Sequence, residues 1–253
     1  MTTTAVITGC GSAAGIGFAT ARMLGESGAV VFITATSERI NDRVEELRSH
    51  GIDANGSVRD LTLPDSAAEL IRSAIARTGR VDILVNNAGM TSVTQKNPAG
   101  PGDRLTDADW ETALKRNLTT AFNTTREALQ HMVARRYGRI VMVSSLSGPV
   151  MAFPNDAAYH AGKAGLIGLT RSVAVDYARY GITCNAVAPG WIGTASATEE
   201  EIAAGHATPV GRPGTADEVA HAIASLANPN AAYITGQVLV VDGGNSINEF
   251  RVP

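Results

Sequence analysis

Short apolar runs that alternate with helix-forming segments constrain the fold of this chain more than any other feature. Runs rich in β-branched side chains predict strands at Ala5–Thr8, Val30–Thr34, Val81–Asn86, Arg139–Ser144, Thr183–Ala188 and Val238–Asp242, with another short strand at Ala54–Asp60. Continuous apolar strands are typical of a sheet covered on both faces, and alternation with helices is typical of parallel crossovers. The sequence therefore predicts an α/β fold: a doubly wound parallel sheet with helices on both faces.

Two of the helices have recognisable ends. The segment Gly15–Glu26 is followed by Gly28, which is a natural helix stop. Thr215 and Glu218 have the spacing of a capping box, which opens a helix over Glu218–Leu226.

No Pro- or Ser-rich linker divides the chain, so residues 1–253 are predicted to form a single domain. The largest breaker-rich stretch, Gln95–Gly102, is predicted to be a surface loop. In a doubly wound sheet, ligands bind at the carboxyl ends of the strands, and candidate functional residues are expected there.

Composition narrows the class of protein. The chain is 44% hydrophobic and 18% charged, as expected for a globule that buries a sizeable core. Its net charge of -3, and the absence of an apolar stretch of ~18 residues, argue against nucleic-acid partners and a membrane span. Cys10 and Cys184 are too few for a disulfide framework and are expected to be buried small residues. No secretory leader follows Met1 and no histidine spacing resembles a metal site, so we expect a cytoplasmic protein without metal.

A glycine-rich segment, Thr8–Gly17, follows the first predicted strand and opens the first predicted helix. Glycines let a pyrophosphate approach the backbone amides, and a helix N-terminus favours its negative charge. Ala14 stands where the common G-x-G-x-x-G fingerprint has its third glycine, and a plain strand-to-helix turn is the alternative interpretation. The position after the first strand favours a nucleotide-binding Rossmann sheet.

Tyr159 and Lys163 are four residues apart, which places both side chains on one face of a helix. A free tyrosine has a pKa near ~10. A neighbouring ammonium lowers that pKa and makes the phenol a better general acid or base. An accidental surface pair is the alternative, and further residues are needed to decide.

Those residues resemble the catalytic set of the classical short-chain dehydrogenase/reductase family. Tyr159 and Lys163 match its Tyr-x-x-x-Lys motif, and Asn117 matches an asparagine that holds a water in a proton relay. Ser145, just after a predicted strand, matches the serine that binds the substrate carbonyl; Ser147 competes, although the Ser-x-x-Gly pattern favours Ser145. The resemblance covers nearly the whole chain.

The glycine segment resembles the family's Thr-Gly-x-x-x-Gly-x-Gly motif in one of two registers. Either Gly15 and Gly17 are the later glycines, with two extra residues in the loop, or Ala13 and Gly15 hold those places. The resemblance implies further cofactor contacts along the chain. The complete predicted set is Gly9, Ser12, Gly15, Ile16, Gly17, Thr36, Ser37, Arg39, Asp60, Leu61, Asn87, Ala88, Gly89, Tyr159, Lys163, Pro189, Gly190, Ile192 and Thr194.

The residue after the second strand favours NADP(H) over NAD(H). Thr36 stands where an acidic residue would bind the ribose 2′-hydroxyl, and Thr36, Ser37 and Arg39 offer groups for a 2′-phosphate. Ala14 in place of a basic residue, and Glu38 if it points inward, favour the alternative, an NAD(H)-dependent secondary-alcohol dehydrogenase.

By resemblance, NADPH delivers hydride to a carbonyl held by Ser145 and Tyr159, and Tyr159 donates the proton. The general likeness is to β-ketoacyl-carrier-protein reductases, in which Arg136 would meet an acidic carrier, but Val175 replaces an expected second basic residue. A free ketone is therefore a rival to an acyl thioester. The predicted substrate pocket contains Ser145, Val150, Met151, Phe153, His160 and Trp191.

Three further expectations come from the same resemblance. An enoyl reductase is disfavoured because its tyrosine and lysine are more widely separated than Tyr159 and Lys163. A non-catalytic nucleotide sensor is disfavoured because all four catalytic positions are kept. The family likeness implies a homotetramer, with Asn117–Arg135 and Tyr159–Arg179 packed across one interface and Asp242–Pro253 supporting another.

Overall fold

Seven parallel strands form one sheet in the computed structural model, which describes residues 2–89 and 100–249. In chain order the strands are β1 (Thr4–Ile7), β2 (Val30–Ala35), β3 (Ala54–Val58), β4 (Ile83–Asn86), β5 (Gly138–Val143), β6 (Ile182–Pro189) and β7 (Val238–Val241). Their order across the sheet is β3-β2-β1-β4-β5-β6-β7, and every pair is parallel. The predicted doubly wound α/β fold is confirmed.

The strand ends differ from the predicted ones by one or two residues. β4 begins at Ile83 rather than Val81, and β3 ends at Val58 rather than Asp60. Val81 and Asp82 are buried before the ladder of β4 begins, so the apolar pattern there marks the core better than it marks the ladder, whereas Asp60 is exposed beyond the end of β3. Most of the predicted loop Gln95–Gly102 lies outside the described residues.

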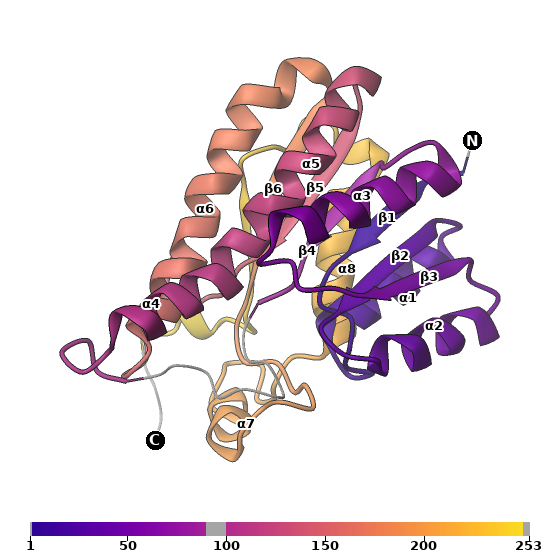
Figure 1. Cartoon of the computed structure of the whole chain (residues 1–253). Helices are drawn as coiled ribbons and strands as arrows, with labels where there is room; N and C mark the ends of the chain where they lie inside the picture. Colours follow the sequence, from indigo (N-terminus) through magenta and orange to yellow (C-terminus); the bar gives the residue numbers. More distant parts are fainter. Residues whose placement is uncertain (1, 90–99, 250–253) are drawn as a thin grey trace.

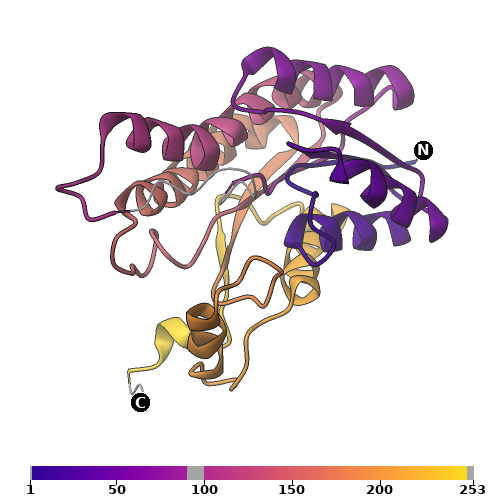
Figure 2. The ribbon, with the colours of Figure 1, turned by 60° about the horizontal axis from the view of Figure 1, so that its bottom comes forward.

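Helices cover both faces of the sheet (Figures 1 and 2). One layer contains α1 (Ile16–Glu26), α2 (Arg39–Ser49) and α8 (Ala216–Ala227), and the other contains α3 (Pro64–Thr78), α5 (Thr120–Arg135) and α6 (Ala157–Tyr177). The shorter segments are α4 (Asp107–Leu114), the π-helical turn η1 (Lys115–Thr119), α7 (Glu199–His206) and the 3₁₀ turns η2 (Ala178–Tyr180), η3 (Pro229–Ala231) and η4 (Asn245–Ile247).

Alternate strand residues belong to two separate cores. Ile7 and Ile33 pack with α1, α2 and α8, whereas their neighbours Val6 and Phe32 belong to the core on the side of α3, α5 and α6. Because side chains alternate across a strand, strands that are apolar throughout bury both faces. This explains why the strands appear in the sequence as unbroken apolar runs.

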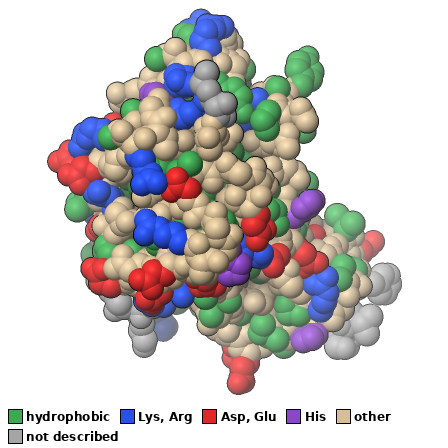
Figure 3. Space-filling model, turned by 90° about the vertical axis from the view of Figure 1, so that its right-hand side faces the viewer, with side chains coloured by type: hydrophobic (Ala, Val, Ile, Leu, Met, Phe, Trp, Pro, Cys, Tyr) green, Lys and Arg blue, Asp and Glu red, His purple; other side chains and the backbone are tan. Residues whose placement is uncertain are grey.

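The predicted capping box is present: Thr215 Oγ1 accepts from the Glu218 amide at 3.1 Å, and the Glu218 carboxylate accepts from the Thr215 amide. A second capping box, between Thr198 and Glu201, opens α7. Within residues 2–89 and 100–249, no helix is long and apolar enough to cross a membrane. On the face seen in Figure 3, acidic and basic side chains are interspersed.

The strand order reverses between β1 and β4, and connections leave these neighbours in opposite directions. A crevice at the carboxyl end of such a switch point is the usual ligand site of a doubly wound sheet. The segments that follow the parallel strands begin at this edge, and most of the predicted cofactor and catalytic residues lie on these segments.

Candidate active site

The glycine-rich loop adopts the register with two extra residues. Gly15 is the N-cap residue of α1 and its amide donates to Ser12 O at 3.1 Å, which turns the chain at Ala13 and Ala14. Gly17 is buried in α1, where a Cβ would lie 2.7 Å from Gly9 O. Since no side chain caps α1, its first amides are available to an anion.

Thr8 and Asn87 join this loop to the end of β4. Thr8 Oγ1 accepts from the amides of Asn87 and Ala88 at 3.0 and 2.9 Å, and Asn87 Nδ2 donates to Thr8 O and Gly9 O. Gly9 has a φ of 73°, and a Cβ there would lie 2.9 Å from Ala88 Cα. These contacts hold the two sides of the switch point together.

Arg39 folds back over the glycine loop. Its Nε donates to Ser37 Oγ at 3.4 Å, and its Nη2 lies 3.9 Å from the point where a Cβ on Gly11 would stand. Thr36 is exposed beside them. The Glu38 carboxylate instead accepts from Asn41 Nδ2 at 2.7 Å, so it is held along α2.

Asp60 and Leu61, predicted to lie at an adenine ring, are held differently from each other. The Asp60 carboxylate accepts from the Thr62 amide and hydroxyl at 3.0 and 2.6 Å. Leu61 is buried in the core, and its carbonyl accepts from Asn123 Nδ2 at 3.0 Å. The Leu61 side chain therefore faces the core, which leaves only its backbone for a ligand.

The first two turns of α6 bring Tyr159 and Lys163 to the end of β5. Lys163 Nζ donates to Val143 O at 3.0 Å and lies 5.7 Å from the centroid of the Tyr159 ring. The Ser144 hydroxyl donates to Lys163 O at 2.8 Å, which ties this turn of α6 to the strand end. The Ser145 side chain is hydrogen-bonded to Tyr159, whereas Ser147 donates its amide to Ser145 Oγ.

Burial displaces both pKa values. It raises the pKa of Tyr159 to about 12, against the opposing effect of Ser145 and with smaller additions from the charges of Asp156 and Glu201. It lowers the pKa of Lys163 to about 8. For the chain on its own, burial is the largest influence on the pKa of Tyr159, and it acts against the lowering that a neighbouring ammonium would give.

Asn117 lies on η1, a single wide turn inserted between α4 and α5. It is fully buried, and its Nδ2 donates to Ala113 O at 3.1 Å. A Cβ on Gly89 would lie 3.1 Å from Asn117 Oδ1 and 3.2 Å from Lys163 Nζ. The two polar atoms therefore converge on one small space beside Gly89.

The segment after β6 forms the opposite side of the crevice. Pro189 is buried at the strand end, and a Cβ on Gly190 would lie 2.7 Å from Asp242 Cβ. Ile192 bridges to Gly214, and the Thr194 amide donates to Ile192 O at 2.8 Å. This turn is fixed by its own backbone and leaves the Thr194 hydroxyl within 3.1 Å of Ser196 Oγ.

The predicted pocket residues divide into an aromatic cluster and a more open pair. The Phe153 ring centroid lies 4.6 Å from that of His160, 6.2 Å from Tyr159 and 6.4 Å from Trp191. Met151 Sδ lies 3.9 Å from Asn245 Nδ2, and Val150 is exposed. The structure thus brings three of the predicted side chains, those of Phe153, His160 and Trp191, into one cluster with Tyr159.

Comparison with known proteins decides the family. A family profile described as "Enoyl-(Acyl carrier protein) reductase" matches residues 9–246. The cis-4-hydroxycyclohexanecarboxylate dehydrogenase of Sinomonas cyclohexanicum is 42% identical over 244 residues, covering 95% of each chain. The chain belongs to the short-chain dehydrogenase/reductase family of oxidoreductases.

Other members of the short-chain dehydrogenase/reductase family are also similar to it. The 3-oxoacyl-[acyl-carrier-protein] reductase FabG of Vibrio cholerae is 40% identical over 238 residues, covering 92% of this chain and 94% of the relative. A crystal structure of an actinorhodin polyketide ketoreductase variant with NADPH has a TM-score of 0.88 at 34% identity, covering 98% of both chains.

Sequence reasoning missed three groups at this short-chain dehydrogenase/reductase site. The Val143 carbonyl and the Ser144 hydroxyl hold Lys163, and no motif marks a backbone acceptor at a strand end. Asp156 is the N-cap residue of α6 and is 9% exposed. Asp is a preferred N-cap residue, so the sequence could have predicted Asp156 at the start of the helix that carries Tyr159.

Proposed function

We propose that this oxidoreductase reduces a ketone to a secondary alcohol with NADPH, using Tyr159 as the proton donor. The observation that carries the proposal is the convergence of Ser145, Tyr159, Lys163 and Asn117 at the carboxyl end of the sheet, beside an uncapped helix N-terminus. Bound there, a nicotinamide supplies the hydride that the carbonyl carbon receives.

The residues around the crevice fit a dinucleotide. The amides of Gly15, Ile16 and Gly17 and the Ser12 segment would hold the pyrophosphate, because α1 has no capping side chain and Gly9 and Gly17 allow close approach. Asp60 and the Leu61 backbone would lie at the adenine. Asn87, Ala88 and Gly89, with the turn of Pro189, Gly190, Ile192 and Thr194, would enclose the nicotinamide half.

Ser145 and Tyr159 would orient the substrate through its carbonyl oxygen, each by a hydroxyl hydrogen bond. Because the pKa of Tyr159 is raised to about 12, the phenol holds its proton at neutral pH and has one to give to the developing alkoxide. Lys163 would hold the ribose and return a proton to Tyr159. The space between Lys163 Nζ, Asn117 Oδ1 and Gly89 suits a water that supplies it.

Arg39 supports NADP(H) over NAD(H). Its guanidinium lies over the glycine loop beside Ser37, while the Glu38 carboxylate accepts from Asn41 along α2. A 2′-phosphate would find a cation and two hydroxyls, those of Thr36 and Ser37, at this corner. The ketoreductase of similar structure was determined with NADPH.

The test is oxidation of NADPH and NADH by the pure protein with bulky free ketones, an acetoacetyl thioester and an enoyl thioester. We expect ketone-dependent oxidation of NADPH and little with NADH; reduction of the enoyl thioester alone would contradict the proposed reaction. Arg39→Ala should raise the KM for NADPH about 10- to 100-fold, the contribution of a hydrogen bond to a charged group. Arg43→Ala, one turn further along α2, is the matched control, since Arg43 pairs with Glu46.

A further inference from the structure

Asp156 carries a buried carboxylate oxygen that nothing in the described residues satisfies. Asp156 precedes Tyr159 by three residues in the sequence and is 9% exposed. Its Oδ1 atom has no hydrogen-bond partner among the described residues. The neighbouring Tyr159 amide and His160 lower its pKa, but burial outweighs them and raises it. A buried acceptor without a partner costs free energy unless a ligand supplies a donor or a positive charge.

This carboxylate lies beside an aromatic cluster, because its charge acts on Tyr159 and the charge of His160 acts on it. Phe153, Tyr159, His160 and Trp191 form a connected cluster with ring centroids 4.6 to 6.4 Å apart. The faces of such rings attract a cation, and clusters of them bind quaternary ammonium groups. The cluster therefore has the chemistry to accept a positive charge as well as an apolar surface.

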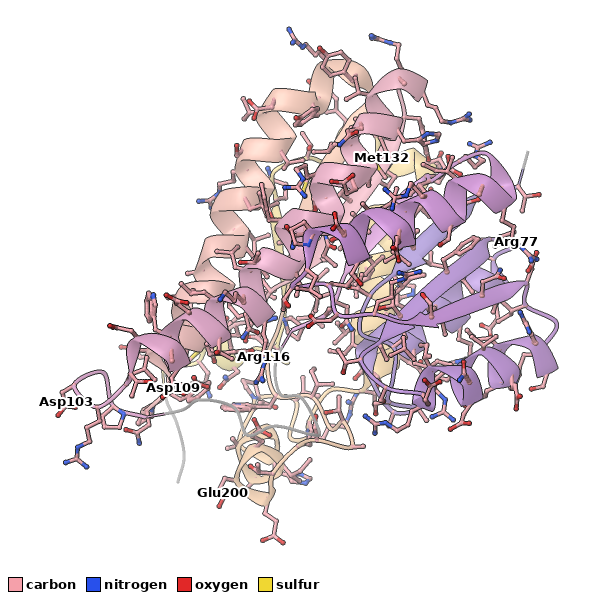
Figure 4. All side chains as sticks on the ribbon, viewed as in Figure 1. Arg77, Asp103, Asp109, Arg116, Met132 and Glu200 are labelled. Carbon is pink, nitrogen blue, oxygen red and sulfur yellow. The ribbon has the colours of Figure 1, made fainter. Side chains whose placement is uncertain are left out.

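A second negative charge comes from α7. The charges of both Asp156 and Glu201 reach Tyr159, and Glu199 and Glu200 lie in the same first turn of α7. The cations around the site are placed elsewhere: Lys163 is buried against Val143 O, and Arg212 is paired with Glu218. Arg116, on η1 and above α7 in the view of Figure 4, is a cation that opposes this field.

We propose that the substrate is a ketone carrying a positively charged ammonium group, held by Asp156 and Glu201 within the rings of Phe153, His160 and Trp191. This rests on the proposed ketone reduction and names its substrate class. It also implies that anionic carrier-protein and coenzyme A thioesters are disfavoured, because the same carboxylates repel them.

Three ketones of equal ring size separate charge from shape. N,N-dimethyl-4-oxopiperidinium is positive at every pH, 4,4-dimethylcyclohexanone is its neutral isostere, and 4-oxocyclohexanecarboxylate is negative. We expect kcat/KM to be about tenfold higher for the cation than for its isostere, the order of magnitude of one partly buried charge contact. The anion should be the poorest of the three.

Asp156→Asn keeps the size of the side chain and removes its charge, so it should reduce the cation-to-neutral ratio of kcat/KM about fivefold to tenfold. Asp176→Asn is the matched control. It lies twenty residues further along α6, about 30 Å away at 1.5 Å per residue, and should leave the ratio unchanged. Glu201→Gln, which keeps the capping box, should act in the same direction as Asp156→Asn.

Equal kcat/KM values for the cation and its neutral isostere would overturn the proposal while leaving ketone reduction intact. A preference for 4-oxocyclohexanecarboxylate would also overturn it, and would indicate that Arg116 supplies the charge that controls substrate choice. If none of the three ketones is reduced, the proposed reaction itself fails for them. Calorimetric titration with N,N-dimethyl-4-oxopiperidinium then decides the inference. Binding that Asp156→Asn abolishes supports it, and no binding to the unaltered protein overturns it.

Discussion

Tyr159 and Lys163 share one helix face, yet burial moves their pKa values in opposite directions. Burial raises the pKa of Tyr159 to about 12 and lowers the pKa of Lys163 to about 8. In both cases the interior favours the neutral form of the side chain over the charged form. The phenol therefore keeps its proton at neutral pH and loses it less easily than a free tyrosine would.

Replacing Tyr159 by Phe should remove the proton donor and keep the shape of the ring. We expect kcat for ketone reduction to fall about 10²- to 10⁴-fold, the usual contribution of a positioned acid. Steady-state kinetics measure this, and fluorescence titration with NADPH should show cofactor affinity largely kept. Full activity of Tyr159→Phe would remove Tyr159 from the mechanism.

Lys163→Met should change how stability depends on pH. The pKa of Lys163 is about 8 in the folded chain and 10.5 in its ordinary state, so between these values the unfolded chain binds more protons and folding becomes more favourable as pH rises. The variant lacks this contribution. In urea unfolding at pH 7, the free energy of unfolding of Lys163→Met should therefore exceed that of the unaltered protein, and this advantage should disappear near pH 10.5. The same difference in free energy at both pH values would contradict the burial argument.

The sequence predicted those site residues whose relative placement follows from their spacing along a helix. Tyr159 and Lys163 were expected on one face because four residues make about one helical turn, and α6 has them there. What it could not reveal is the environment: the raised tyrosine pKa depends on chain segments that cover the ring from elsewhere. The partners of Lys163, a carbonyl of β5 and a hydroxyl beside it, are likewise invisible before the fold is known.

At the scale of elements, the decisive irregularity is η1. The sequence predicts a helix over Asn117–Arg135, but α4, η1 and α5 follow one another from Asp107 to Arg135 with a wide π-helical turn at Asn117. Such turns rotate the side chains that follow and recur at functional sites. No composition signal distinguishes Lys115–Thr119 from ordinary helix, so this feature required the structure.

The space beside Gly89 gives a test of this arrangement. A Cβ there would stand 3.1 Å from Asn117 Oδ1 and 3.2 Å from Lys163 Nζ, so Gly89→Ala should displace the relay. We expect kcat to fall at least tenfold, the lower part of the effect of a misplaced catalytic group. Gly102→Ala, which meets nothing within 4 Å, is the control for kinetics and thermal unfolding. Unchanged kcat for Gly89→Ala would show that this space is not used.

For the whole molecule, the sequence pattern predicted the strands more fully than the substrate side. The apolar runs located the seven strands of the sheet to within two residues, whereas the strand order came from the structure. The substrate side depends on segments such as Val150–Asp156 and the turn before α7, whose positions are set by contacts between distant loops. Residues 90–99, between β4 and α4, lie outside the described residues.

We propose that the chain assembles as a homotetramer. Val175 and Ile247 lie in the two segments that the family resemblance places at interfaces, and they are 81% and 88% exposed. Light scattering should give a mass of four chains of 26.2 kDa. Val175→Glu, which places a charge on α6, should lower that mass, whereas Val58→Glu, at an exposed position on β3 outside the expected interfaces, reports the effect of charge alone. A monomeric unaltered protein would overturn the proposal.

The two cores, one on each face of the sheet, support different functional groups and can therefore change separately in evolution. Helix α1, whose N-terminus follows the glycine-rich loop, packs on one core, and α6, which carries Tyr159 and Lys163, packs on the other. We expect substitutions in the first core to alter nucleotide binding before they alter reactivity. Those in the second should do the reverse, so descendants of one ancestor can change what they act on while inheriting the same coenzyme.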